Sequence, residues 1–217
     1  MLLLPAFAMV DNVTPKRVPT LIEDFINKAP TNTMPLAPVP LPQSLPVPDD
    51  AETAPPMTST PCPHRVLILL CSQRTRDIRC GQSAPLLRKE LERHLRPLGL
   101  YRDLDDERPG GVGIYFISHV GGHKYSANMM VYRRRDAFGM DDVERAKAET
   151  EEVKPKAAPK DGDEDEAEGA AQCIWLARVR PEDCENIVKY TVLQGKVVKP
   201  ESQLRGGFDR EKGLLSW

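Results

Sequence analysis

Two short apolar runs constrain the fold of this chain most strongly, because each is followed at once by a residue that can bind metal. Val66–Leu70 is entirely apolar and leads into Cys71, and a second, largely apolar run, 113–118, leads into His119. Each run has the length and composition of a buried strand. Neighbouring strands of an open α/β sheet can bring their carboxyl ends to one edge, where ligands bind. The sequence therefore predicts an α/β sheet with a ligand site at that edge.

The candidate ligands are of types that transition metals prefer. Eight residues separate Cys71 from Cys80, and three residues separate His119 from His123. Thiolates and imidazoles together suit zinc and iron–sulfur centres. Glycines at 121 and 122 disfavour a helix between the histidines, since each costs about 1 kcal/mol relative to alanine there. A single cysteine after a strand is more often a packing residue, so the prediction rests on all four donors together.

The spacing of the donors discriminates between kinds of site. A zinc finger has two to four residues between its cysteines and about a dozen before its histidines, and the wider cysteine pair here disfavours one. A Rieske centre pairs one cysteine with one histidine in each loop, and this interleaving is absent. The remaining pattern is that of a thioredoxin-like ferredoxin whose second ligand pair is histidine. A thiol–disulfide oxidoreductase of thioredoxin type, which normally uses Cys-x-x-Cys, and a structural zinc-binding scaffold stay open as alternatives.

Three segments resemble one known family. The family is the sucrase/ferredoxin-like family, also called the actin patches distal protein family. The segments similar to it are Cys71 through Cys80 to Leu87, 118–128 with the strand after it, and 174–183. The resemblance covers about residues 64–135 and 173–217. The start of the chain is similar to the middle of longer family members, so we expect an upstream domain to be missing.

The resemblance implies a fold, a cofactor and an activity. It implies a thioredoxin-like domain with a non-Rieske [2Fe–2S] cluster held by Cys71, Cys80, His119 and His123. Histidine ligation raises the reduction potential relative to all-cysteine ligation. The implied role is one-electron transfer or redox sensing with a redox partner protein, rather than enzymatic catalysis. Because a mitochondrial relative shares the motif, a mitochondrial location is an alternative to the cytoplasmic one.

Periodicity and end signals predict the secondary structure. The predicted order is β-α-β-β-β-α, an α/β, thioredoxin-like fold with one mixed sheet whose middle helix is lost or reduced to 121–128. The apolar stripe after Cys80 predicts a helix that starts at Gly81, with Pro85 in its first turn. Proline followed by two acidic residues predicts the start of the last helix. The predicted strands are 65–71, 112–118, 128–134 and 174–179, and the predicted helices are 81–96 and 181–193.

Composition divides the chain. Residues 30–63 contain 11 of the 21 prolines, which predicts a disordered, extended linker without strands. Residues 136–171 are acidic and almost free of aromatic residues, which predicts a disordered insertion that adds nothing to the core. The predicted ferredoxin domain is thus split into 64–135 and 172–217, and 1–29 is predicted to be a remnant of an upstream region.

The net charge of −2 conceals an asymmetry. The acidic insertion holds 13 acidic and 5 basic residues, so the rest of the chain has a surplus of six basic residues. Such a surplus can attract an acidic protein. We expect the loop arginines Arg74, Arg76 and Arg79 either to favour the reduced cluster or to be merely solvated. The run 133–135 lacks interleaved aromatic residues, so we interpret it as a solvated strand end and expect no nucleic-acid partner.

The remaining cysteines and histidines are expected to play no part in the site. Five cysteines in 217 residues do not suggest a disulfide framework. We expect Cys62 and His64 to be incidental, and neither Cys173 nor Cys184 has a Cys-x-x-Cys partner.

The two ends of the sequence bear on location. The apolar segment 1–10 is interrupted by Pro5 and is shorter than the roughly 20 residues that cross a bilayer. We therefore expect no membrane span and a cytoplasmic protein. The tail Leu215-Ser216-Trp217 resembles a signal read by the cytosolic iron–sulfur targeting complex, which is the second expected partner.

Overall fold

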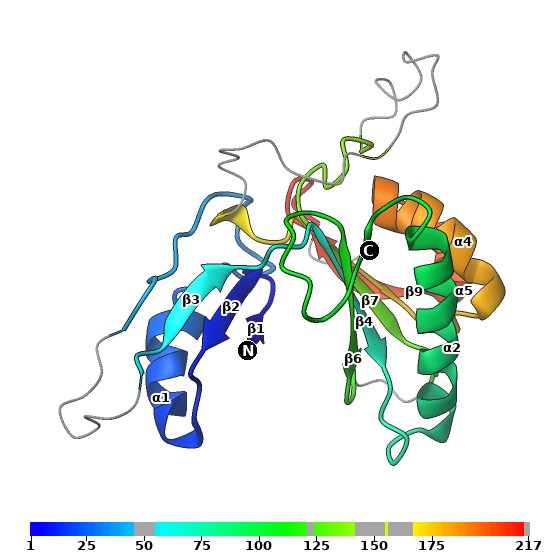
Figure 1. The fold of residues 1–217 in the computed structure, drawn as a ribbon. Helices are drawn as coiled ribbons and strands as arrows, with labels where there is room; N and C mark the ends of the chain where they lie inside the picture. Colours follow the sequence, from blue (N-terminus) through cyan, green and yellow to red (C-terminus); the bar gives the residue numbers. More distant parts are fainter. Residues whose placement is uncertain (46–54, 121–123, 142–154, 156–166, 215–217) are drawn as a thin grey trace.

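A mixed sheet forms the centre of the computed structural model, which describes residues 1–45, 55–120, 124–141, 155 and 167–214. Its six strands lie in the order β5-β6-β4-β7-β8-β9 (Figure 1). β4 runs parallel to β6, and β7, β8 and β9 continue the sheet as antiparallel neighbours. The strands are β4 (Val66–Cys71), β5 (Tyr101–Arg102), β6 (Val112–Ile117), β7 (Met129–Arg133), β8 (Gln172–Leu176) and β9 (Leu204–Asp209).

The predicted mixed α/β sheet is confirmed, and its four predicted strands are the central ones. Val66, Ile68 and Leu70 of β4 are fully buried on the face that helices cover. Leu67 is equally buried in a separate cluster. This pattern explains why β4 reads as a continuous apolar run instead of an alternating one.

Helices cover one face of the sheet (Figure 1). The long helix α2 spans Ile78–Leu95 and buries Leu87, Leu91 and Leu95 at helical spacing against β4 and β6. The second predicted helix is present as a 3-10 turn, one short α-helical turn and a π-helical segment. These are η4 (Pro181–Asp183), α4 (Cys184–Asn186) and η5 (Ile187–Val192), and α5 (Pro200–Gln203) follows.

The start of α2 differs from the sequence prediction. The helix begins at Ile78, because the Asp77 carboxylate accepts a hydrogen bond from the Arg79 backbone N–H and caps it. Cys80 therefore lies inside the first turn instead of before it, and Pro85 lies in the helix interior instead of the first turn.

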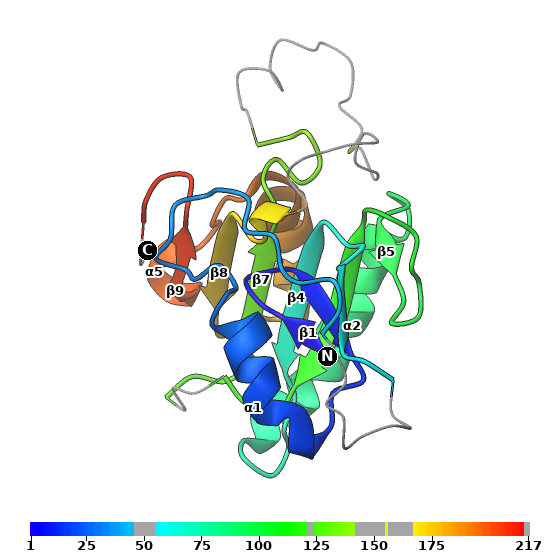
Figure 2. The same cartoon turned by 90° about the vertical axis from the view of Figure 1, so that its left-hand side faces the viewer.

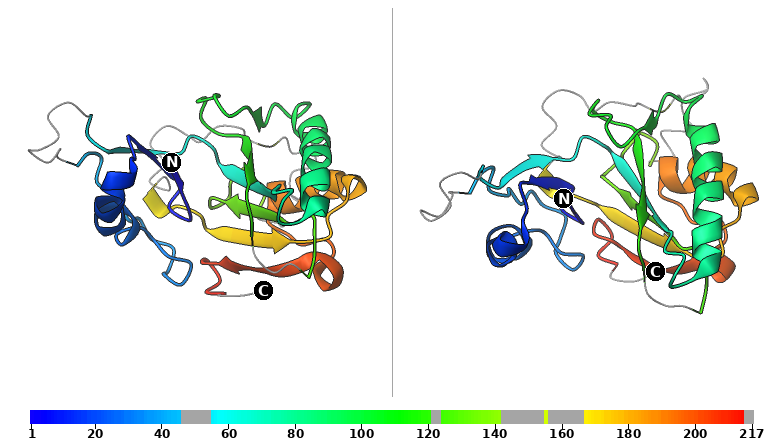
Figure 3. Two further views of the ribbon diagram at one scale, coloured as in Figure 1. Left: turned by 90° about the horizontal axis from the view of Figure 1, so that it is seen from below. Right: turned by 60° about the horizontal axis from the view of Figure 1, so that its bottom comes forward.

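The N-terminal part of the chain covers the other face of the sheet (Figures 1, 2 and 3). Phe7, Cys62 and Phe208 pack with Leu67 in one buried cluster on this face. The N-terminal elements comprise a three-stranded antiparallel sheet and one short helical run. They are β1 (Leu2–Leu3), β2 (Ala8–Asp11), β3 (Thr58–Pro61), η1 (Pro15–Arg17), α1 (Val18–Leu21) and η2 (Ile22–Ile26).

The prediction that residues 30–63 form a linker without strands is wrong at its end. β3 pairs with β2 in antiparallel register, and the Ser59 N–H donates to the Gln43 carbonyl at 2.9 Å. Arg210 donates to the carbonyls of Met34 and Pro35 at 3.0 and 2.9 Å. These contacts could not be predicted from composition, because the partner residues come from distant segments of the chain. Residues 46–54 lie outside the described part.

The prediction that residues 136–171 add nothing to the core is wrong at both ends of the segment. Ala137 and Phe138 are buried in the main core, and Ala170 is buried in the cluster on the opposite face. The disorder predicted for the middle of this segment concerns 142–154 and 156–166, which lie outside the described residues. In the described chain, no helix is both long and apolar enough to cross a membrane.

Candidate metal centre

The structure brings Cys71 and Cys80 together at the carboxyl end of β4. Cys71 is the last residue of the strand, and Cys80 lies in the first turn of α2. Both are buried, with exposed fractions of 4% and 2%, and their thiol groups are within hydrogen-bonding reach of each other. Two of the four predicted donors therefore lie side by side at this edge of the sheet.

A glycine makes this approach possible. A Cβ added at Gly81 would lie 2.7 Å from Arg74 Cβ and 2.8 Å from Arg74 Cα, distances that real Cβ atoms do not tolerate. The loop between β4 and α2 therefore crosses directly over the first turn of the helix. Asp77 fixes the other side of this loop by capping α2. The close crossing is what returns Cys80 to Cys71 after eight intervening residues.

The end of β6 completes this edge of the sheet. Cys71 pairs with Ile117 in the parallel register, and Ser72 donates to the Ile117 carbonyl through its backbone N–H at 2.9 Å and its hydroxyl at 3.1 Å. The backbone N–H of Val120 donates to the Cys71 thiol. The loop that follows β6 therefore rests on one of the two candidate sulfur ligands.

Of the two predicted histidine ligands, the structure describes only His119. His119 is exposed and immediately precedes Val120, so it lies on the loop that contacts Cys71. His123 lies outside the described residues. Within the described residues, no three side chains of histidine, cysteine, aspartate or glutamate form a group that could hold a metal ion. The four-ligand set thus stays a prediction.

Sequence reasoning gave no role to Asn128, which ties three elements together at this edge. Its carbonyl oxygen accepts from the Cys71 N–H at 3.1 Å, and its side-chain amide donates to the Tyr125 carbonyl at 2.8 Å. The indole N–H of Trp175 donates to the Asn128 side-chain oxygen at 3.1 Å. The burial of Asn128 and its partners arise from the fold, so the local sequence gives no signal for this role.

The electrostatic environment of Cys71 suits a sulfur that can carry charge when a cation binds. Burial, together with the neighbouring Cys80 thiol, raises the pKa of Cys71. The backbone N–H groups of Val120 and Gln73 act in the opposite direction, because they donate to the sulfur and favour the thiolate. Bound metal deprotonates coordinating thiols. Two buried sulfurs, one of them with backbone donors, fit a metal–thiolate group.

The other cysteines lie in other parts of the fold. Cys62 and His64 precede β4, and the length of this strand, about 17 Å at roughly 3.3 Å per residue, separates them from Cys71 at its other end. Burial raises the pKa of Cys173 to about 12. Burial, with nearby carboxylates, also raises the pKa of Cys184 to about 12. All five cysteines are free of disulfides in the described structure.

The interpretation of residues 133–135 as a solvated strand end is wrong for two of the three arginines. Arg133 and Arg134 are each 2% exposed. Arg133 forms an ion pair with Asp141 and donates to the Val192 carbonyl at 2.9 Å. Arg134 donates to the carbonyls that precede β4 and lies over the Phe7 ring. These arginines are structural groups that join the sheet to its neighbours.

A cluster of cations surrounds Tyr125 beside the candidate centre, and sequence reasoning missed it. The guanidinium groups of Arg178 and Arg205 lie over its ring, 4.1 and 3.9 Å from the centroid. Lys124 lies 5.5 Å from the same centroid. Although desolvation opposes the shift, the Lys124 hydrogen bond and the positive charges lower the pKa of Tyr125.

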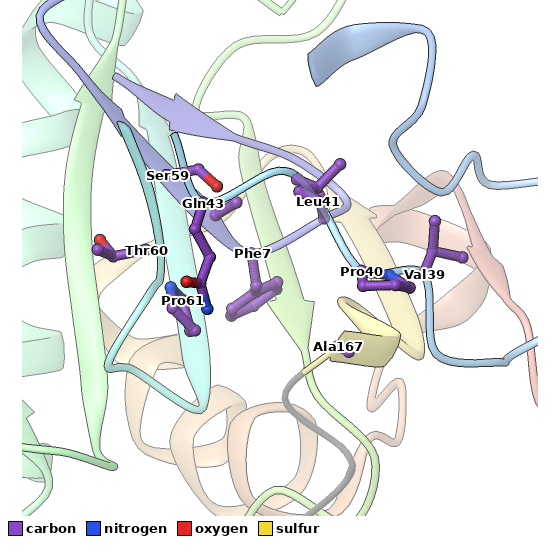
Figure 4. Close-up of a pocket in the computed structure, with 11 residues that line it drawn as sticks. Phe7, Val39, Pro40, Leu41, Gln43, Ser59, Thr60, Pro61 and Ala167 are labelled. Carbon is purple, nitrogen blue, oxygen red and sulfur yellow. The ribbon is translucent and has the colours of Figure 1, made fainter. Parts of the chain in front are cut away.

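A separate cavity lies between the N-terminal strands and the segment 39–43 (Figure 4). Its volume is about 260 Å³, and it is lined by Phe7, Leu41, Gln43 and Ser59 among others. Among the described residues, no cysteine, histidine or carboxylate lines this cavity, and none of the predicted ligands Cys71, Cys80 and His119 borders it.

Comparison with known proteins shows partial relatives. The chain is 49% identical over 71 residues to actin patches distal protein 1 of Saccharomyces cerevisiae, a match that covers 33% of this chain and 22% of that protein. It is 28% identical over 136 residues to altered inheritance of mitochondria protein 32 of Clavispora lusitaniae, which covers 63% and 33% of the two chains. The corresponding protein of Debaryomyces hansenii is 30% identical over 133 residues, covering 61% and 33%.

These curated relatives are longer proteins, and the chain spans a third of their length or less. No solved structure matches the chain significantly. A family model described as sucrase/ferredoxin-like matches residues 1–206, nearly the whole chain and well beyond the segments that carry the sequence resemblance. The chain belongs to the sucrase/ferredoxin-like family.

Proposed function

We propose that the chain binds a [2Fe–2S] cluster through Cys71, Cys80, His119 and His123 and acts in one-electron transfer or redox sensing. The observation that supports this most directly is the contact between two buried thiols, one of which also accepts backbone N–H bonds, beside the loop that carries His119. When bound, such a cluster supplies reversible one-electron chemistry, and the protein supplies ligation, hydrogen bonds and solvent exclusion.

The strand order supports a thioredoxin-like assignment within this proposal. β4, α2 and β6 form a parallel strand–helix–strand unit, and β7 and β8 follow as antiparallel neighbours on the other side of β4. The helical run 181–192 closes the domain. Between β6 and β7, the described residues 118–120 and 124–128 form no helix, which agrees with a reduced middle helix.

The chain's own groups would tune the site in defined ways. The N–H groups of Val120 and Gln73 that reach the Cys71 sulfur would stabilise negative charge there and raise the reduction potential. Gly81 and Asp77 would position Cys80, since they set the path of the loop and the first turn of α2. Asn128 would hold the end of β4 against the start of β7.

Anaerobic purification followed by iron, acid-labile sulfide and zinc analysis tests the proposal. We expect about two iron and two sulfide per chain, with a visible absorption spectrum, because that is the composition of the cluster. A colourless preparation without iron that cannot be reconstituted would overturn the proposal. Zinc in stoichiometric amount would instead support the structural zinc scaffold.

The contact between the thiols also favours a second candidate, a thiol–disulfide oxidoreductase. Cys71 and Cys80 are near enough to share a hydrogen bond, and two thiols can form one disulfide with release of two electrons and two protons to a substrate disulfide. Reduction of a model protein disulfide that survives iron removal, and is lost in Cys80→Ser, would favour this candidate.

Partner and location follow as further parts of the proposal. We expect a redox partner protein, and delivery of the cluster by the cytosolic iron–sulfur targeting complex through Trp217, which lies outside the described residues. Removal of Trp217 should then lower iron loading in cells but not in reconstitution of the purified protein. The proposed location is cytoplasmic, with a mitochondrial one as the alternative that the names of two relatives suggest.

A further inference from the structure

The sheet edge that carries Cys71 and Cys80 is surrounded by positive charge. Arg74 and Arg76 are exposed on the loop after β4, which lies at the lower end of the sheet in Figure 1. Within the described residues, neither arginine is within ion-pair distance of a carboxylate. Arg79 pairs with Asp77 at 2.8 Å, so the one carboxylate on this loop is already engaged.

Two further segments bring cations to the same edge. Leu176 at the end of β8 pairs with Met129 at the start of β7, which itself pairs with Leu70 near the end of β4. Arg178 follows β8 directly, and its N–H donates to the Ser126 carbonyl at 2.9 Å. The β9 strand starts beside Leu176, so Arg205 also lies at this edge.

Tyr125 holds this second group of cations in place. Arg178 and Arg205 lie over its ring, and Lys124 is adjacent to it in the chain. Cation–π attraction between the guanidinium groups and the ring orders these side chains. Among the described residues, none of these three cations forms an ion pair with a carboxylate. Lys124 and Arg178 are exposed and Arg205 is half-buried, so this charge is ordered and reaches the surface chiefly through Lys124 and Arg178.

The opposite end of the sheet has the opposite character. The connection from β5 to β6 carries Asp103, Asp105, Asp106 and Glu107. Asp106 pairs with Arg108 and Asp103 with Arg88, whereas Asp105 and Glu107 form no ion pair among the described residues. The molecule therefore presents exposed cations at the edge with Cys71 and exposed carboxylates at the far end. A charge distribution of this kind orients an approaching charged partner before contact.

We infer that the basic edge, formed by Arg74, Arg76, Lys124, Arg178 and Arg205, is the docking surface for an acidic redox protein. This inference rests on the proposed electron-transfer function. A protein partner is favoured over a nucleic acid because guanidinium groups engage the described aromatic rings nearest this edge. Arg178 and Arg205 lie over Tyr125, and Arg88 lies over Phe116 near the end of β6. Rings engaged in this way are less available to stack on a base, as single-stranded nucleic-acid binding normally requires.

Small charged oxidants test the local charge directly. The reduced, cluster-loaded protein is mixed in a stopped-flow instrument with hexacyanoferrate(III), an anion, or with tris(phenanthroline)cobalt(III), a cation, at increasing ionic strength. Attraction at a basic edge predicts that salt slows the reaction with the anion and speeds the reaction with the cation. In the triple variant Arg76→Glu, Lys124→Glu, Arg178→Glu, the rate with the anion should fall roughly tenfold at low salt.

A matched variant provides the control. Lys16→Glu, Lys89→Glu and Arg93→Glu reverse three exposed charges that are not part of the basic edge; Arg93, for example, lies about 20 Å along α2 from Cys80 at 1.5 Å per residue. The control should retain the salt dependence of the parent. Equal rates and equal salt dependence for the parent, the triple variant and the control would overturn the docking surface while leaving the cluster intact.

A binding measurement separates this inference from the proposed function. Fluorescence anisotropy is recorded with a labelled octaglutamate peptide and with a single-stranded DNA octamer. We expect the triple variant, but not the control, to lose peptide binding. Tighter DNA than peptide binding by the parent would overturn the assignment to a protein partner. If the purified protein holds no cluster, the proposed function fails, and the peptide result alone decides whether the edge binds acidic chains.

Discussion

The cysteines of this chain occupy two contrasting kinds of environment, although all of them are buried. Cys71 and Cys80 meet at the sheet edge, where a second thiol and backbone N–H groups surround the sulfur. Cys173 and Cys184 lie in the two hydrophobic clusters on either face of the sheet. The Cys184 thiol donates to backbone carbonyls, at 3.7 and 3.9 Å, and nearby carboxylates disfavour its thiolate. Backbone donors and a second sulfur at the edge, rather than burial, therefore mark the candidate ligands.

The contrast also concerns the backbone around the two pairs. At the edge, the loop between β4 and α2 and the loop after β6 supply the groups around sulfur. In the clusters, side chains fixed in strands and helices surround it. We therefore expect substitutions at the edge to alter metal binding with little effect on stability. Substitutions in the clusters should lower the free energy of unfolding with little effect on metal binding.

The largest expected effect comes from removing one edge thiol. Cys80→Ala should abolish iron binding, because it deletes a predicted ligand, whereas Cys184→Ala should retain full iron and lose about 1–2 kcal/mol of unfolding free energy. Iron analysis and urea unfolding of both variants measure the two effects. Full iron content in Cys80→Ala would remove the distinction between the two environments.

Disrupting the buried ion pair should give a large effect on stability alone. Arg133→Gln leaves Asp141 without its partner in a site where the arginine is 2% exposed. Breaking a buried pair costs about 3–5 kcal/mol, so thermal unfolding should shift strongly downward. Iron per folded molecule should be unchanged. Complete loss of iron in folded Arg133→Gln would show that the core and the edge are coupled.

A smaller effect is expected from closing the space at the helix start. Gly81→Ala should displace the loop, because the new Cβ would lie 2.8 Å from Arg74 Cα. Iron affinity should fall about tenfold, even though alanine favours the helix by roughly 1 kcal/mol. Gln82→Ala, an exposed change at the next position, is the control. Competition with a chelator measures both variants, and equal affinities would show that the crossing of loop and helix does not position Cys80.

The smallest effect is expected from shortening the acidic segment between its buried ends. Deleting 143–166 should change the unfolding free energy by less than about 1 kcal/mol, because loop closure depends weakly on length. Deleting 138–170 instead removes Phe138, Asp141 and Ala170 from their buried contacts and should destabilise strongly. Denaturant unfolding of both deletions compares them, and equal stabilities would contradict the assignment of the buried ends to the core.

Continuous apolar runs allowed the central part of the fold to be predicted. β4, β6, β7 and β8 follow from local composition, and α2 follows from leucines at helical spacing. β9 was missed because Gly206 and Gly207 interrupt its strand pattern. β3 was missed because Pro61 and the surrounding prolines read as linker, although pairing with β2 makes it a strand.

The candidate site was predictable in part for a similar reason. The meeting of Cys71 and Cys80 follows from a strand end and a helix start, which the local sequence encodes. The roles of Asn128 and Tyr125 depend on contacts with Trp175, Arg178 and Arg205 from the far end of the chain. A single sequence contains no local signal for such long-range pairings.

Pulsed electron paramagnetic resonance of the dithionite-reduced protein tests the proposed cluster and its histidine ligands together. We expect one unpaired electron per chain with hyperfine couplings from two histidine nitrogens, one lost in His119→Cys and the other in His123→Cys. The reduction potential should fall in each variant, because thiolates donate more charge than imidazoles. A signal without nitrogen coupling would contradict the histidine ligands, and the absence of any signal from iron-loaded protein would contradict the cluster itself.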